Sequence, residues 1–361
     1  MQIHARADIL SQAWIFRQFC YNSKMKIATY PTHLANHRRF LRIKQLIDEF
    51  LPNQGYTKVE VPIMSPQLLP ESYLDVFATE YRYYQKPQQL YLIPSTELFL
   101  KRLLASGIGS CYTLDQVFRN SEPAVNKHNF EFTMLEMYKV NADYLQIADD
   151  TLALLRFLAQ KLFKKSELTY QGKLVQLDRF EKITVAAAFK KYAHIPDIFN
   201  HERFFSDAKA RGFRVETDFS YVDLWSEIYS LAVEPHLGMH GRGTVIYDYP
   251  KELAAMVNYN EEKGVAERLE IYIHGMELGN CGNETTQKGV RQQFAERFTE
   301  EIQERKRLGK AAYAIDWEFL DVLEQLPPTA GIAIGIDRLA MLFCDVKSIT
   351  DLKIIGIEQK D

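Results

Sequence analysis

Three separated segments of this 361-residue chain carry charged side chains inside apolar, strand-like sequence. In the first, Arg119 ends one apolar run, and Glu131 and Glu136 lie in the next. A buried arginine requires an anionic partner, because an unpaired charge costs several kcal/mol in a dry sheet. Either Arg119 pairs with a carboxylate inside the sheet or it faces a bound anion, and this segment alone favours neither interpretation.

The second segment is "MELGNCGNE", in which Glu277 and Glu284 stand seven residues apart with Gly279 and Gly282 between them. A bend at the glycines would bring both carboxylates to one point. Such a pair suits Mg²⁺, which prefers one or two carboxylates together with substrate phosphates. The alternative is a polar turn with two solvated acids, which the spacing on its own favours.

The third segment is "GIAIGIDRLAML", residues 331–342. Small residues at Gly331, Ala333 and Gly335 leave one face of a strand open to a ligand, while the isoleucines between them fill the other face. Arg338 then begins a helix, where a cation opposes the positive end of the helix dipole unless an anion lies in front of it. The pattern predicts a groove for a phosphate and a flat ring, and its alternative is a tightly packed strand-helix corner.

The elements that must position these residues follow from hydrophobic periodicity. Helices are predicted from the Asn36 cap to Gly55 and over residues 95–106, 143–165, 185–192, 203–211, 224–233, 288–308 and 317–326. Strands are predicted over 57–63, 89–94, 110–120, 130–140, 243–250 and 266–280, and at the start of the third segment. Because the strands follow one another like hairpins and do not alternate with helices, we expect an α+β fold, an antiparallel sheet flanked by helices.

Composition narrows the class of protein. The chain has 47% hydrophobic and 25% charged residues and a formal net charge of -3, so it can bury a large core and has no overall attraction to nucleic acid. Its four cysteines are far apart, which predicts reduced thiols in a cytoplasmic protein. The sequence contains neither common glycine-rich phosphate loop and no apolar run long enough for a membrane, so side chains must hold any nucleotide.

Taken in order, the segments resemble the three signature motifs of the class II aminoacyl-tRNA synthetases. The first predicted helix and "VEVPIMSP" are similar to motif 1, "FRNSEP" with "HNFEFTMLEMY" to motif 2, and "GIAIGIDRL" to motif 3. The resemblance covers about residues 35–344, and Asp337 in "GIDR" points to the lysyl branch. It implies a catalytic domain at 35–361, preceded by an extension at 1–34 in which Met25 is a candidate native start.

The resemblance also implies a reaction: ATP and Mg²⁺ activate an amino acid as an aminoacyl-adenylate, with release of pyrophosphate. Arg119 and Arg338 are the expected catalytic residues, on the α- and γ-phosphates, and Glu277 and Glu284 the expected metal ligands. Further ATP contacts are expected from Asn120, Ser121, Glu122, His128, Asn129, Leu278 and Gly335. The expected contacts with the amino acid are Ser95, Thr96, Glu97, Tyr138, Asn280, Glu284 and Ala333.

The acceptor follows from a narrower resemblance. Lysyl-tRNA synthetases carry an N-terminal OB-fold, whereas only about 35 residues precede the motif 1 helix here. Ala333 also replaces their glycine. Both features are similar to the elongation factor P (R)-β-lysine ligases, which implies lysine or (R)-β-lysine as substrate, elongation factor P as acceptor and a motif 1 homodimer. A tRNA acceptor is less expected, because the net charge is negative and the OB-fold is missing. The basic segment at residues 305–310 would favour tRNA, but it is interpreted as a solvated helix end.

Two departures from the family pattern leave alternatives open. Ser121 occupies the usual acidic position of motif 2, with Glu122 one residue later. Cys281 and Gly282 replace a Gly-Phe pair, which removes an aromatic wall from the amino-acid site. The alternatives to elongation factor P modification are therefore the charging of a tRNA or another acceptor, the use of another amino acid, and a catalytically silent nucleotide-binding regulator.

Overall fold

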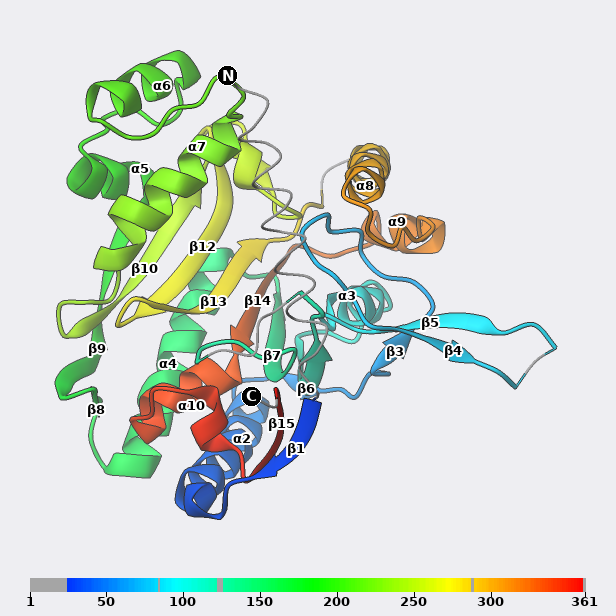
Figure 1. Ribbon diagram of the computed structural model, residues 1–361, viewed down its shortest axis with the longest axis vertical. Helices are drawn as coiled ribbons and strands as arrows, with labels where there is room; N and C mark the ends of the chain where they lie inside the picture. The colour runs from blue at the N-terminus through cyan, green and yellow to red at the C-terminus, as the bar shows by residue number, and fades with distance from the viewer. Residues whose placement is uncertain (1–24, 84, 122–125, 287–288, 360–361) are drawn as a thin grey trace.

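A ten-stranded sheet organises the computed structural model, which describes residues 25–83, 85–121, 126–286 and 289–359 (Figure 1). The strand order is β2-β6-β7-β14-β13-β12-β10-β9-β8, with β11 paired to β12. The bounds are β2 Thr57–Lys58, β6 Cys111–Phe118, β7 Glu131–Val140, β8 Glu167–Tyr170, β9 Lys173–Thr184, β10 Arg242–Tyr249, β11 Tyr259–Asn260, β12 Val265–Ile273, β13 Met276–Asn283 and β14 Thr329–Gly335. The pairings are antiparallel except β2 with β6 and β9 with β10, so the α+β fold predicted from sequence is confirmed.

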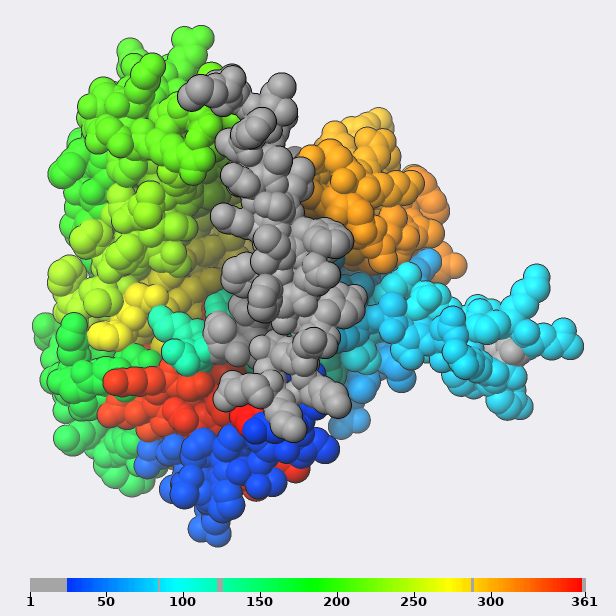
Figure 2. Space-filling model, viewed as in Figure 1, coloured from blue at the N-terminus to red at the C-terminus, as the bar shows by residue number. Residues whose placement is uncertain are grey.

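Two smaller sheets lie beside the large one. A three-stranded sheet contains β3 Met64–Ser65, β4 Ala78–Tyr81 and β5 Gln88–Leu92, and its β4–β5 hairpin projects from the body of the molecule (Figure 2). The other pairs β1 Met25–Thr29 with β15 Ile355–Gln359. The sequence patterns predicted neither β1 nor β15.

Three helices cover one face of the sheet and form the main hydrophobic core with it. They are α2 Leu34–Asn53, α4 Tyr144–Phe163 and α10 Ile336–Cys344. Ile332, Ile334 and Ile336 lie in this core and are at most 2% exposed, as their alternation with small residues predicted. The helix predicted from an Asn36 cap in fact begins at Leu34, and Asn36 instead donates to the carbonyl of Asp351 at 3.3 Å.

Two groups of helices cover the ends of the opposite face. One contains α3 Glu97–Ala105, α8 Val290–Arg307 and α9 Trp317–Leu323. The other contains α5 Val185–Ala188, α6 His201–Ala210, α7 Tyr221–Ile228 and the π-helical turns η2 Phe189–Ala193 and η3 Tyr229–Val233. Short 3-10 turns are η1 Pro31–His33, η4 Glu234–His236, η5 Lys251–Leu253 and η6 Ile349–Leu352. None of the helices in the described residues is long and apolar enough to span a bilayer.

Two predicted strands differ in the structure for local reasons. The predicted strand over 57–63 is regular only in β2, because Pro62 has no N–H to donate to a ladder. The predicted strand over 266–280 is two strands, β12 and β13. His274 and Gly275 both have positive φ, 53° and 65°, as a two-residue hairpin turn requires. The turn folds the chain back antiparallel, so β12 and β13 lie side by side.

The basic segment at residues 305–310 is not simply a solvated helix end, because Arg305 is only 1% exposed. Its Nη1 donates to the carbonyl of Glu71 at 2.6 Å and to that of Leu74, and its Nε donates to the carbonyl of Ala311 at 2.7 Å. The carbonyl of Asp75, next along the chain, accepts from the N–H of Asn120 at 2.8 Å. Arg305 thus fixes a loop that contacts the motif 2 segment directly.

We predict that Arg305→Met lowers the free energy of unfolding by about 2–4 kcal/mol, because three carbonyl groups lose a charged donor. Urea unfolding measures the change. Arg307→Met is the matched control, since the Arg307 side chain is 71% exposed and pairs only with Glu304 among the residues described. Equal stability of the two variants would contradict the assigned role of Arg305.

Candidate active site

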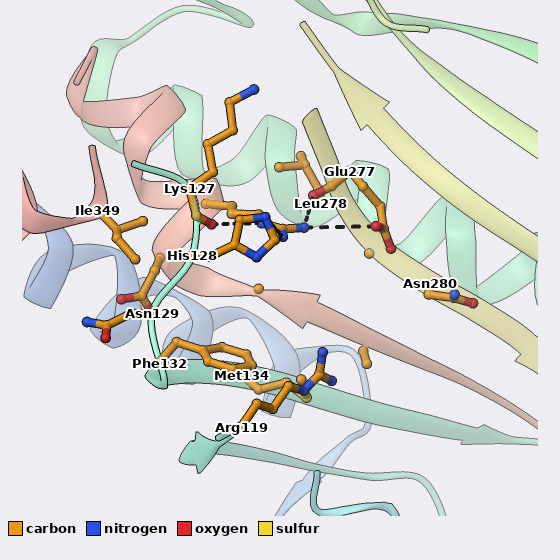
Figure 3. A pocket seen from close by; sticks show the side chains of 15 residues that line it. Arg119, Lys127, His128, Asn129, Phe132, Met134, Glu277, Leu278, Asn280 and Ile349 are labelled. Carbon is orange, nitrogen blue, oxygen red and sulfur yellow. Dashed lines mark hydrogen bonds and ion pairs between the residues drawn. The ribbon is translucent and has the colours of Figure 1, made fainter. Parts of the chain in front are cut away.

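A cavity of about 360 Å³ lies on the face of the sheet opposite the main core, between the ends of β6, β13 and β14 (Figure 3). Many of the residues expected to contact ATP or the amino acid line it: Arg119, His128, Asn129, Glu277, Leu278, Asn280, Ala333, Gly335 and Arg338. Lys127, Phe132 and Met134 also line it and were not predicted. The volume is within the range of small-molecule sites in proteins.

Arg338 closes one end of the cavity. Gly335 precedes α10, so Arg338 lies in the first turn of that helix. Its Nη1 donates to the carbonyl of Glu277 at 3.2 Å and lies 3.9 Å from a carboxylate oxygen of the same residue. Its Nε donates to the carbonyl of Lys127 at 3.2 Å. These contacts position the guanidinium of Arg338 so that it can bind an anion in the cavity. The Arg338 side chain is 26% exposed.

Arg119 lies across the cavity from Glu277 (Figure 3). It directly follows β6, and its guanidinium carbon is 5.3 Å from the ring centre of Phe132 on the neighbouring strand β7. Asn129 adds a polar atom, because its Oδ1 is buried without a hydrogen-bond partner among the described residues. An anion between the two arginines would be stabilised by both, and an amine donor facing Asn129 would satisfy its buried oxygen.

Glu277 and Glu284 do not meet, contrary to the expected bend. β13 runs extended from Met276 to Asn283, so the two residues lie at opposite ends of a strand, roughly 20 Å apart along it. Burial raises the pKa of Glu277 to about 7, and the nearby Glu270 carboxylate adds to this effect. Glu270 on β12, which was not predicted from the sequence, is the candidate second carboxylate for Mg²⁺ near Glu277, and its Oε1 accepts from Arg268 Nη2 at 2.7 Å.

Glu284 belongs to a second cluster, with Glu97 and Lys101. The Nζ of Lys101 lies 2.5 Å from Glu97 Oε1 and 2.6 Å from Glu284 Oε2, and its side chain is 1% exposed. Burial alone would lower the pKa of Lys101, but the two carboxylates raise it above its ordinary value. Lys101 is therefore a buried cation between two residues expected to bind the amino acid, and it was not predicted from the sequence.

Glu136 adds a third carboxylate to this cluster. Its Oε1 accepts from Ser95 Oγ at 2.6 Å and from the N–H of Thr96 at 3.0 Å. Burial raises the pKa values of Glu136 and Glu284 to about 7. Three carboxyl groups lie around the single ammonium of Lys101, and further ammonium groups would stabilise their charged forms, which suits a substrate with more than one ammonium group.

Cross-strand pairing joins the cavity to the carboxylate cluster. Ala333 on β14 lies opposite Glu136 on one side and Asn280 on the other, and both it and Asn280 line the cavity. Two residues along each strand, Tyr138 lies opposite Gly331, where a β-carbon would come within 2.4 Å of the Tyr138 ring. The residues expected to contact ATP and those expected to contact the amino acid thus occupy one continuous face.

The remaining motif 2 residues lie in a loop beside this face. Asn120 donates its N–H to Asp75, as described above, and the hydroxyl of Ser121 accepts from the N–H of Asp75 at 3.4 Å. Ser121 thus anchors the loop at the position where the family has an acidic residue. Glu122 lies outside the described residues.

Comparison with known proteins agrees with this geometry. Residues 25–356 match the family described as tRNA synthetases class II (D, K and N). The chain belongs to this family.

Among its class II relatives are three lysine–tRNA ligases. That of Carboxydothermus hydrogenoformans is 33% identical over 316 residues, which are 86% of this chain and 63% of the relative. That of Escherichia coli K12 is 33% identical over 313 residues, 85% and 60% of the two chains. That of Thioalkalivibrio sulfidiphilus is 34% identical over 320 residues, 86% and 62%. The protein is therefore a class II synthetase-like chain related to lysyl-tRNA synthetases, and it spans about six tenths of their length.

We predict that Glu136→Gln flattens the pH dependence of stability between about pH 4.5 and 7. The Glu136 carboxyl has a pKa of about 7 in the folded protein against an ordinary 4.5, so the folded state binds more protons in this range. Wild-type stability therefore falls as the pH rises, by on the order of 3 kcal/mol from this group. Glutamine stays neutral and can accept the same hydrogen bonds.

Urea unfolding at pH 5 and pH 8 tests this prediction. The variant should gain stability relative to wild type at pH 8 and not at pH 5. Glu296→Gln, the same change on the exposed surface of α8, is the control. Parallel pH profiles of wild type and Glu136→Gln would show that Glu136 ionises normally.

Proposed function

We propose that this protein uses ATP to activate lysine or (R)-β-lysine as an aminoacyl-adenylate and transfers it to a lysine side chain of elongation factor P. The observation that carries the proposal is the joined face described above. A cavity with an arginine on each side continues, through Ala333, into a cluster of three carboxyl groups around the single ammonium of Lys101. ATP matches the first part, and an amino acid with two ammonium groups matches the second.

The residues support a mechanism of positioning and charge neutralisation. Arg119 binds the α-phosphate, which the carboxylate of the amino acid attacks. Arg338 binds the γ-phosphate and neutralises the departing pyrophosphate. Glu97 and Glu284 bind ammonium groups of the substrate, while Lys101, which lies 2.5 Å from Glu97 and 2.6 Å from Glu284, holds both carboxyl groups in place. Mg²⁺, held beside Glu277 and Glu270, would supply further neutralisation of phosphate charge.

ATP–pyrophosphate exchange tests the activation step. We expect exchange that depends on lysine or (R)-β-lysine, and we expect Arg338→Ala to reduce it at least 100-fold without changing the circular dichroism spectrum. Arg214→Ala, at a side chain 68% exposed, should retain wild-type exchange. No exchange with either amino acid, in protein that binds ATP, would refute the activity and favour a silent nucleotide-binding regulator.

The choice of substrate and acceptor rests on Ala333. Its methyl group lies on the ligand face between Glu136 and Asn280, where lysyl-tRNA synthetases have glycine. A difference of one carbon in a pocket typically changes substrate discrimination by ~1–3 kcal/mol. Transfer to tRNA is the second candidate, because the relatives are lysine–tRNA ligases. The homodimer expected from motif 1 is also part of the proposal.

A transfer assay separates the acceptors. Labelled lysine and (R)-β-lysine are offered with elongation factor P or with tRNA in separate reactions. We expect label on elongation factor P, and we expect Ala333→Gly to shift the preference towards lysine by roughly tenfold. Label on tRNA alone would overturn the acceptor assignment and leave the activation step standing.

A further inference from the structure

Gly282 is a glycine because of a neighbouring side chain, not because of its backbone. Its φ is not among the positive values of the described glycines, so other residues could adopt its conformation. A β-carbon at this position, however, would lie 2.0 Å from Cγ1 and 2.7 Å from Cβ of Val257. Val257 therefore occupies the volume that a side chain at position 282 would need.

Several contacts hold Val257 against β13. Val257 forms an isolated β-bridge with Glu284, and the N–H of Asn258 donates to the carbonyl of Asn283 at 2.8 Å. The buried Glu267 carboxylate then accepts from the side-chain amides of three asparagines, at 2.7–2.9 Å: Asn258, Asn260 and Asn283. Because these amides come from both sides of the contact, the segment that carries Val257 is fixed to the strand that carries Gly282.

The position of Val257 relates it to the amino-acid site. Gly282 pairs with Gly331, and Gly331 pairs with Tyr138, so all three share the face of the sheet that carries the carboxylate cluster. The Tyr138 ring covers Gly331 as Val257 covers Gly282. Neighbouring strands are ~4.8 Å apart, so the side chains of Tyr138 and Val257 lie over adjacent glycines. Val257 also forms a β-bridge with Glu284.

We propose that Val257 is a specificity-determining residue that forms the apolar wall of the amino-acid site, against the methylene chain of an alkylammonium substrate. The inference rests on the proposed amino-acid activation. It adds that, in this chain, the segment before β11 supplies the wall. In the family pattern, the aromatic residue at position 282 supplies it. An isopropyl group beside Glu284 contacts the chain whose ammonium group the carboxylate binds.

Exchange kinetics with lysine and ornithine test this role. Val257→Ala should raise KM for lysine roughly 10- to 100-fold with kcat changed less than threefold, and should weaken the discrimination against the shorter ornithine. Val245→Ala is the matched control, because Val245 is fully buried in the core on the opposite face. It should lower Tm and leave KM unchanged.

A side-chain exchange provides the second arm. In Val257→Gly/Gly282→Val the isopropyl group moves from one segment to the other, and glycine is required at 257 because its Cβ is also too close. Each single variant should raise KM at least tenfold, and the double variant should return it to within about fivefold of wild type. Such recovery is non-additive, as expected for residues that share one volume.

The outcomes separate the two proposals. Unchanged KM in Val257→Ala with a lowered Tm would overturn the wall and leave amino-acid activation intact. If wild type shows no exchange, calorimetric titration with lysine decides: binding weakened by Val257→Ala supports the wall while activation fails. No lysine binding by wild type would overturn both.

Discussion

The active face depends on one constraint, the register between strands β7, β14, β13 and β12. Side chains directly opposite each other share a face of a sheet, so pairing alone aligns Glu136, Ala333, Asn280 and Glu270 in one row. The next row is Tyr138, Gly331, Gly282 and Arg268. A slip of one residue in any strand would send its part of each row into the core. The buried isoleucines of β14 oppose such a slip, because they would then face the polar side.

This register divides the face into regions of opposite charge. Arg119 and Arg338 line the cavity at one end of the active face. At the other end, three carboxyl groups surround Lys101. Burial makes both regions effective, since charges interact more strongly where water is excluded. Burial also makes them costly, because it disfavours the charged forms of Glu136 and Glu284 and raises their pKa values to about 7. A substrate with charges complementary to both regions relieves it, so the same desolvation that destabilises the free protein favours binding.

Local patterns in the sequence were sufficient for the α-helices, for the central strands of the large sheet and for much of the cavity, but not for β1, β8, β9 or β15. The alternation of Ile332 and Ile334 with small residues predicted both faces of β14, and the Arg338 position predicted a cation at its end. Contacts between distant segments could not be predicted in this way. Lys101 follows Glu97 by one helical turn, a spacing typical of surface ion pairs, but the packing of α3 against β6, β7 and α9 buries it beside Glu284. Arg305 likewise looked solvated, because its carbonyl partners at Glu71 and Leu74 lie more than two hundred residues away.

Gly282 illustrates the same limit more sharply. From the sequence, a glycine in place of an aromatic residue indicated a missing wall and a looser pocket. In the structure the side chain of Val257 fills this volume. The hydrogen bonds between Glu267 and three asparagines hold the Val257 segment in place. A small residue in a strand therefore has two opposite meanings, an open volume or a volume filled from elsewhere. The two cannot be separated by pattern, because the residue that fills the volume need not be near in sequence. At Gly335 a β-carbon would meet only the Arg338 side chain at 3.9 Å, and the volume is open to the cavity. At Gly282 the corresponding volume is filled by the side chain of Val257, so the residue types at positions 257 and 282 depend on each other.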